Sequence, residues 1–277
     1  MLLSLPIPMN YQEGGRYIDN RSQILGSLIA DISREPFQAT YRGRRIDPEI
    51  TGWAQRLTSY FWPSPDVDYR KTARVLGPWF EEAGRLSDVL LVGGSWSERE
   101  RARAAELAYS MLEWGRVTRQ KEFSPDTVER VFRRALGVSS QWAPMSSGWS
   151  KVAALATAYL EGRPDVAPHV IWDSRVSSSL VRRLDKMLAE RQLDPKASFP
   201  GIGPVAGRGG SRAHGLTLQL KWAHAYGSWR AQVAGSELVR EVRDLLNASG
   251  ISMPLPDEGT GKWTIRGVES VLFMDGY

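Results

Sequence analysis

Cysteine is absent from the 277-residue sequence, and histidine occurs only three times. Without cysteine the chain has no disulfide bond, thiolate zinc site, iron–sulfur cluster or cysteine nucleophile. His169, His214 and His224 are too scattered to suggest a set of ligands, so we expect no metal site. No apolar run approaches the roughly 20 residues that cross a bilayer, and the start MLLSLPIPMNY lacks the features of a signal peptide. These absences predict a cytoplasmic protein that is not bound to a membrane.

The charged residues are weighted towards the basic side. There are 36 lysines and arginines against 31 acidic residues, which give a net charge of +5 and a pI of about 9.5. This excess favours an anionic partner, and the dominant basic residue, arginine, suits phosphate because it donates two parallel hydrogen bonds. Arg42, Arg44 and Arg45 lie in FQATYRGRRI, a possible short strand. They form either an arm or edge near an anion or a solvated basic turn.

Helical patterns dominate the chain from about residue 50 onwards. Ser95 or Ser97 begins one charge-rich helix, and Ser124 with Pro125 begins another, because serine caps a helix and proline suits its first turn. Apolar stripes at helical spacing also cover 148–161, 173–192, 218–235, 236–247 and 265–277. Convincing strands are few. We predict a mainly α fold, with an N-terminal extension over 1–50 that is irregular or forms short strands, and a helical domain over 51–277.

A lysine and an aspartate begin two consecutive helices of this prediction. Lys151 follows PMSSGWS, a turn at a helix N-terminus, where exposed amides and the helix dipole attract phosphate. The same dipole and the apolar neighbours lower the pKa of an amine there and make it more nucleophilic. Asp173 directly precedes the next helix, where its carboxylate can cap amides and stay ionised. Alone they would be a solvated lysine and a helix cap; together they predict a nucleophile and its partner.

The order of residues around this pair resembles the helix-hairpin-helix DNA glycosylases, most closely the 8-oxoguanine glycosylase branch with its archaeal members. In that family a hairpin similar to Leu-Pro-Gly-Val-Gly-x-Lys-Val-Ala precedes a segment similar to Val-Pro-Val-Asp. Lys151 and the two residues after it match the hairpin, Asp173 matches the aspartate, and Arg175 with the valine after it resembles the archaeal form. The match covers about 30 residues, and SSGWSK replaces the two glycines of the family hairpin.

The resemblance implies a helix-hairpin-helix glycosylase-like fold in two lobes, with the cleft near 146–176. It implies that Lys151 attacks the sugar C1′ and expels the base, and that a Schiff base then forms, which can lead to strand cleavage. Asp173 would assist the attack and stabilise charge on the sugar. The target nucleotide would be flipped out of the duplex to reach them. No cofactor is implied, because attack by a protein amine needs neither a metal nor a nucleotide.

The residues around the pair are expected to contact DNA. The expected backbone contacts are Ser146, Ser147, Gly148, Ser150 and Arg175. Trp149 and Trp172 each lie within two residues of the pair, so each is either an aromatic that stacks on the extruded base or a hydrophobic plug between helix ends.

A second glycine-rich stretch, FPGIGPVAGRGG, looks more like a family hairpin in its letters. Val205 stands where the lysine would be, and no aspartate follows at the expected distance. We interpret it as a loop that either approaches DNA through Arg208 and Arg212 or serves as a plain linker.

The expected partner is double-stranded DNA with a damaged or modified base, bound by a monomer in the nucleoid. The base is either an oxidised purine or a bulky modified base of the phage type, which would indicate repair or phage defence respectively. One alternative is a non-catalytic DNA-binding protein on the same scaffold. Another is a helical protein-interaction module with a basic surface.

Overall fold

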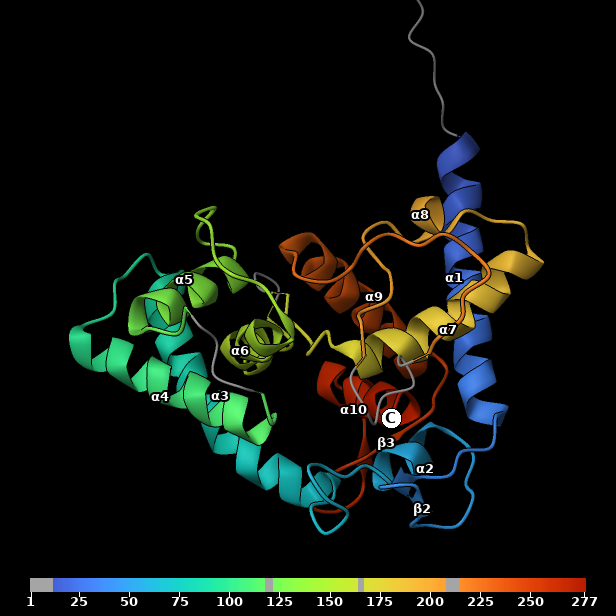
Figure 1. Ribbon diagram of the computed structural model, residues 1–277, viewed down its shortest axis with the longest axis horizontal. Helices are drawn as coiled ribbons and strands as arrows, with labels where there is room; N and C mark the ends of the chain where they lie inside the picture. Colours follow the sequence, from blue (N-terminus) through green and yellow to red (C-terminus); the bar gives the residue numbers. More distant parts are fainter. Residues whose placement is uncertain (1–11, 118–121, 164–166, 208–214) are drawn as a thin grey trace, which may run out of the picture.

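The computed structural model describes residues 12–117, 122–163, 167–207 and 215–277, and it is mainly helical, as predicted (Figure 1). The elements in chain order are α1 (Gln12–Arg34), β1 (Thr40–Tyr41), β2 (Arg44–Arg45), α2 (Trp53–Thr58), α3 (Tyr69–Leu91), α4 (Glu98–Trp114), α5 (Pro125–Ala135), α6 (Ser147–Ala158), α7 (Ser174–Glu190), α8 (Pro195–Ser198), α9 (Trp229–Ala248), β3 (Met253–Pro254), β4 (Thr260–Gly261) and α10 (Ile265–Asp275). The strands form two separate antiparallel hairpins, β1–β2 and β3–β4. In the part of the chain described, no helix combines the length and the apolar character needed to cross a membrane.

Two large apolar clusters divide the helices into two groups. One cluster is enclosed by α3, α4, α5 and α6. The other is enclosed by α1, α2, α7, α9 and α10. Figure 1 shows the first group on the left and the second on the right. The segment between α6 and α7 joins them, because Ile171 belongs to the first cluster while Val170 and Trp172 belong to the second.

The N-terminal region differs from the expectation. Residues 1–50 were expected to be irregular or to form short strands, but α1 is a helix of 23 residues and only the β1–β2 hairpin matches. The helix is stabilised by packing, because an apolar stripe is buried against the second group of helices. The stripe consists of Ile24, Leu25, Leu28, Ile29 and Ile32. Its spacing is helical, so the sequence contained the signal.

The helical pattern expected over 218–235 is wrong for its first half, because α9 begins only at Trp229. A buried carboxylate of α7 holds the preceding segment in another conformation. Asp185 accepts hydrogen bonds from the amides of Gln219 (2.7 Å) and Leu220 (3.0 Å) and from the indole nitrogen of Trp222 (2.8 Å). These three hydrogen bonds hold the segment against α7 instead of in a helix of its own.

The glycine-rich stretch after α8 packs against α7. The hydroxyl of Ser177 donates to the carbonyl of Gly203 (3.1 Å) and accepts from the amide of Val205 (2.9 Å), whose side chain is buried. This part is therefore a fixed connection rather than a second hairpin. Arg208 and Arg212 lie outside the described residues.

The end of α10 is held to α7 and α2 by a buried acid. Asp275 is fully buried and accepts from Arg56 (2.7 Å), Arg183 (2.9 Å) and Ser179 (2.6 Å). Burial alone would raise the pKa of Asp275, but the surrounding guanidinium groups hold it below its usual range. The pairing fixes α10 beside the start of α7, and both of these helices contribute to the cavity described next.

Candidate active site

The extended segment before α7 is fixed by side chains of three helices. Four consecutive backbone amides each donate to a side-chain oxygen of α6, α9 or α10. The pairs are His169 to Thr157 Oγ1 (2.8 Å), Val170 to Ser236 Oγ (3.2 Å), Ile171 to Glu269 Oε2 (2.8 Å) and Trp172 to Ser150 Oγ (2.6 Å). All of these hydrogen bonds are buried, where an unsatisfied amide would cost about 1–3 kcal/mol. The segment therefore has one defined path, and this path ends at Asp173.

Asp173 uses its two carboxylate oxygens for different purposes. Oδ1 caps α7 by accepting from the amides of Arg175 (2.9 Å) and Val176 (3.2 Å). Oδ2 lies 3.9 Å from the amine of Lys151. The helix cap predicted from the sequence is therefore present, and it leaves one oxygen directed at the lysine. A separation of 3.9 Å is too long for a direct hydrogen bond.

Lys151 is the fifth residue of α6, at the start of the second turn rather than at the beginning of the helix, and it is only 6% exposed. Its amine donates to the carbonyl of Ser147 (3.3 Å), and its side chain passes beside Gly115 at the end of α4. A Cβ at position 115 would lie 2.4 Å from Lys151 Cε, so glycine gives the lysine its path. Burial lowers the pKa of the Lys151 amine, although the charges of Asp173 and Glu269 act in the opposite direction. At a given pH, a larger fraction of the Lys151 amine is therefore neutral than in a solvated lysine.

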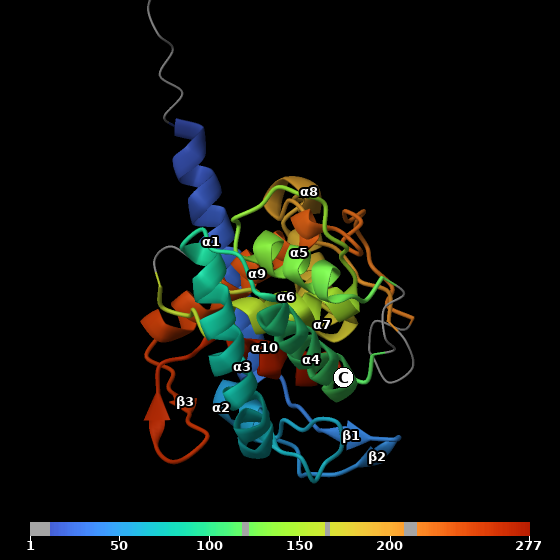
Figure 2. The same ribbon diagram turned by 90° about the vertical axis from the view of Figure 1, so that its left-hand side faces the viewer.

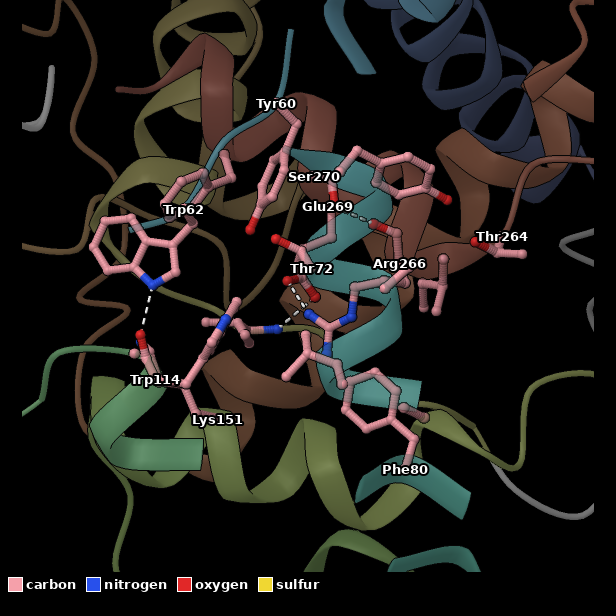
Figure 3. Close-up of a pocket in the computed structure, with 18 of the residues that line it drawn as sticks. Tyr60, Trp62, Thr72, Phe80, Trp114, Lys151, Thr264, Arg266, Glu269 and Ser270 are labelled. Atoms are coloured by element: carbon pink, nitrogen blue, oxygen red, sulfur yellow. Dashed lines mark hydrogen bonds and ion pairs between the residues drawn. The ribbon is translucent and has the colours of Figure 1, made fainter. Parts of the chain in front are cut away.

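Lys151 and Asp173 both line a partly open cavity of about 340 Å³ between the two groups of helices. Figure 3 shows Lys151 from α6 on one side, Arg266 and Glu269 from α10 on the other, and Tyr60 and Trp62 above. Several other lining residues are aromatic, namely Tyr69, Phe80, Trp114 and Phe273. The volume falls within the range of small-molecule pockets, about 300–1,000 Å³, and an aromatic lining is also typical of such pockets. A planar ring can stack against such walls.

Sequence reasoning missed a second carboxylate, which lies in the cavity wall. Glu269 is 5% exposed and bonds the amide of Ile171 through Oε2 and the guanidinium of Arg266 through Oε1. Burial raises the pKa of Glu269, and Arg266 opposes this effect. The available signal was an acidic residue on the apolar face of 265–277, four residues after Ile265 and four before Phe273. A charge at that register of a buried helix indicates a specific partner.

Arg175 lies among aromatic rings rather than acids. Its guanidinium carbon is 4.7 Å from the ring centre of Trp62, 4.6 Å from that of Phe273 and 4.6 Å from that of Tyr277. Among the residues that the structure describes, its side chain forms no ion pair and donates no hydrogen bond. Three rings thus hold a cation in the cavity wall without neutralising it.

The other predicted contacts are only partly where the sequence placed them. Ser146 caps α6 by accepting from the amide of Trp149, and it is half-buried, as is Ser147. Gly148 and Ser150 are buried, and Ser150 bonds the 170–172 segment, so neither is exposed to a partner in this structure and their contact with DNA stays a prediction.

The two tryptophans are also not in the cavity. Trp149 is 2% exposed and stacks on Phe123 in the first cluster, with ring centres 6.0 Å apart. Trp172 is 4% exposed in the second cluster, and a Cβ at Gly235 would lie 2.4 Å from its ring. Neither lines the cavity, so the expectation that they stack on a base is not met and the hydrophobic-plug interpretation agrees with their positions.

Across the described ranges, no group of three or more His, Asp or Glu side chains is arranged to hold a metal ion. No protein family, no curated protein and no solved structure matches the chain. Any functional assignment therefore depends on the chemistry of the cavity and on the sequence resemblance around Lys151 and Asp173.

Proposed function

We propose that the protein is a DNA glycosylase with associated lyase chemistry, in which Lys151 is the nucleophile. The observation that carries the proposal is a buried amine of lowered pKa, 3.9 Å from a carboxylate oxygen, in a cavity whose lining includes several aromatic side chains. An amine must be neutral to attack, and burial increases the neutral fraction. The resemblance to helix-hairpin-helix glycosylases supports the same two residues independently of the cavity.

The reaction begins when the lone pair of the Lys151 amine forms a bond to the sugar C1′. The glycosidic bond breaks, and the base leaves with the electron pair and takes up a proton. The nitrogen loses a proton, the sugar ring opens, and a Schiff base links Lys151 to the DNA. Elimination of the 3′ phosphate can then cleave the strand.

Asp173 stabilises the positive charge that develops on the sugar, because its Oδ2 faces the amine while Oδ1 stays bound to the helix amides. The gap of 3.9 Å leaves the amine and this oxygen free of a direct bond to one another. Asp173 acts through charge and position, since its carboxylate is fixed by the cap and by the path of the segment before it.

The substrate is a nucleotide flipped from duplex DNA into the cavity. Enzymes that act on a base within a duplex must extrude it, and an aromatic wall compensates part of the lost stacking. Arg175 is the candidate for binding the phosphate of that nucleotide, because it is an unneutralised cation in the wall. The excised base is an oxidised purine or a bulky modified base of the phage type.

Borohydride trapping tests the proposal. Duplexes with 8-oxoguanine, hydroxymethylcytosine or glucosylated cytosine are incubated with the protein, and borohydride reduces any Schiff base to a stable adduct. The expected result is an adduct with at least one duplex, which is lost in Lys151→Ala and retained in Lys186→Ala, since Lys186 is exposed on α7. Circular dichroism of both variants checks that they are folded.

Two results would contradict the proposal. An adduct that persists in Lys151→Ala would assign the nucleophile elsewhere. DNA binding without an adduct across a broad panel of bases would favour the non-catalytic DNA-binding protein, in which Lys151 and Asp173 have only structural roles.

A further inference from the structure

The β1–β2 hairpin is a tight turn with an unusual residue at its tip. Thr40 pairs with Arg45 and Tyr41 with Arg44, so the connection consists of Arg42 and Gly43 alone. Both have positive φ, 50° and 77°. Two-residue turns with two positive φ angles strongly favour Asn-Gly, Asp-Gly or Gly-Gly. Arginine at the first of these positions is therefore not explained by the turn.

Left-handed backbone costs a residue with a side chain about 1–2 kcal/mol relative to the ordinary helical region. Such conformations are concentrated at functional positions. The Arg42 guanidinium packs over the Tyr41 ring at 5.1 Å, a contact whose weak attraction at an exposed site only partly offsets that cost. A side chain retained at this position points to a role for its charge.

The three arginines of the hairpin are exposed and not neutralised. Arg42, Arg44 and Arg45 form no ion pair and donate no side-chain hydrogen bond within the described ranges. Asp47 and Glu49 follow shortly in the sequence, but neither pairs with them. Three guanidinium groups without acidic partners among the described residues, on one short exposed hairpin, favour an anion with several charges.

Aromatic contacts connect this hairpin to the cavity wall. Tyr41 packs on Phe61 (5.8 Å between ring centres), Phe61 packs on Tyr277 (5.3 Å), and the Arg175 guanidinium carbon lies 4.6 Å from the Tyr277 ring centre. With 5.1 Å from Arg42 to Tyr41, these four separations place the Arg42 and Arg175 guanidinium groups at most about 21 Å apart. Figure 2 shows the hairpin projecting from the body on the side where the C-terminus lies.

We propose that the β1–β2 hairpin binds the phosphate backbone of duplex DNA several nucleotides from the target nucleotide. The inference rests on the proposed function, since the DNA must lie over the cavity for the hairpin to reach it. At about 3.4 Å of rise per nucleotide, 21 Å corresponds to at most about six steps along one strand. The contact carries no base specificity and sets the position of the duplex.

The test measures how binding of an unmodified duplex of about two helical turns depends on salt, from about 50 to 200 mM KCl. The variant Arg44→Thr/Arg45→Thr removes two charges and keeps strand-forming residues. The matched control Arg85→Gln/Arg99→Gln removes two exposed charges from α3 and α4. Each phosphate contact contributes about 0.9 to the slope of log K against log salt. We expect the hairpin variant to lose between about one and two units of slope and about tenfold in affinity, with the control unchanged.

Arg42→Asn provides a variant that is not expected to unfold. Asparagine suits the turn better than arginine, so Tm should stay equal or rise while DNA affinity falls severalfold. A loss of affinity accompanied by a lower Tm would overturn this part of the reasoning.

The outcomes separate the hairpin from the enzyme. If both hairpin variants bind DNA with the affinity and the salt slope of the wild-type protein, the hairpin contact is overturned. The proposed lysine chemistry is unaffected by that result. Failure of wild-type protein to bind any duplex overturns the hairpin contact, while the adduct experiment decides on the glycosylase. Loss of binding to phosphatidylserine vesicles in Arg44→Thr/Arg45→Thr, with DNA binding intact, assigns the hairpin to a membrane and overturns the proposal.

Discussion

Protonation of one buried histidine is predicted to destabilise the junction on which Asp173 depends. His169 begins the extended segment, and its ring lies between α5 and α9. Nε2 is 3.2 Å from the carbonyl of Ala135, and Nδ1 is 3.1 Å from the hydroxyl of Ser236. A carbonyl only accepts, so Nε2 carries the hydrogen of the neutral ring. Burial lowers the pKa of His169 to about 4, although the bond to Ala135 opposes the shift.

The sign and size of the effect follow from linkage. The folded state holds His169 neutral, so its contribution is fully present above the ordinary pKa of about 6.5 and is lost as the pH falls from there towards 4. One pKa unit corresponds to about 1.4 kcal/mol. Between pH 7.5 and pH 5.0 the protein should lose about 2 kcal/mol through this residue, and about 3 kcal/mol once the pH is well below 4.

The assay is urea unfolding of wild-type protein and His169→Gln at pH 7.5 and 5.0. Carboxylates titrate in both proteins. The informative quantity is therefore how much free energy of unfolding each protein loses between pH 7.5 and 5.0, and the difference between these two losses. We expect the variant to lose about 2 kcal/mol less than wild type over this interval. His224→Gln controls for removal of an exposed histidine. Equal losses in wild type and His169→Gln would refute the reasoning, whatever the absolute stability of the variant.

Two further substitutions test how the reactive pair is held. Gly115→Ala places a Cβ 2.4 Å from Lys151 Cε, so adduct formation should fall at least tenfold while the free energy of unfolding changes by less than about 1 kcal/mol. The control is Gly26→Ala, which has open space at its Cβ. It should stabilise the protein slightly and leave the adduct yield unchanged. Ser150→Ala leaves the amide of Trp172 unsatisfied and should cost about 1–3 kcal/mol in urea unfolding. Its adduct yield should also fall, since Asp173 follows directly, and a variant with wild-type yield would show that this bond does not position the acid.

Features set by local chemistry were predictable from the sequence. Ser97 and Ser124 cap α4 and α5 as expected, with Pro125 in the first turn, and Asp173 caps α7. A cap depends on three or four neighbouring residues, so a short stretch of sequence contains all that determines it. The pairing of Lys151 with Asp173 was also predictable, because a short helix and a short return connect them.

Features set by distant partners were not predictable. The aromatic rings around Arg175 come from positions 62, 273 and 277, and the acceptor that fixes Ile171 comes from position 269. The register of Glu269 on an apolar helix face indicates that it has a partner, but local spacing identifies neither that partner nor the rings around Arg175. The error over 218–227 has the same origin, since Asp185 overrides a helical pattern from about 35 residues away.

The protein contains a structural ion pair with which Lys151 and Asp173 can be compared. Arg56 and Asp275 are buried as well, and their atoms approach to 2.7 Å. Arg56 also donates to the carbonyl of Glu35, and Asp275 also accepts from the hydroxyl of Ser179. Lys151 and Asp173 stay 3.9 Å apart and line a cavity, and glycine at position 115 keeps the space that the lysine needs. Because Coulomb energy falls as 1/r, holding the pair at 3.9 Å instead of 2.7 Å gives up about a third of the attraction, together with the direct hydrogen bond that would help to compensate desolvation. Stability alone does not favour such an arrangement, whereas the proposed attack of the amine on a bound sugar requires it.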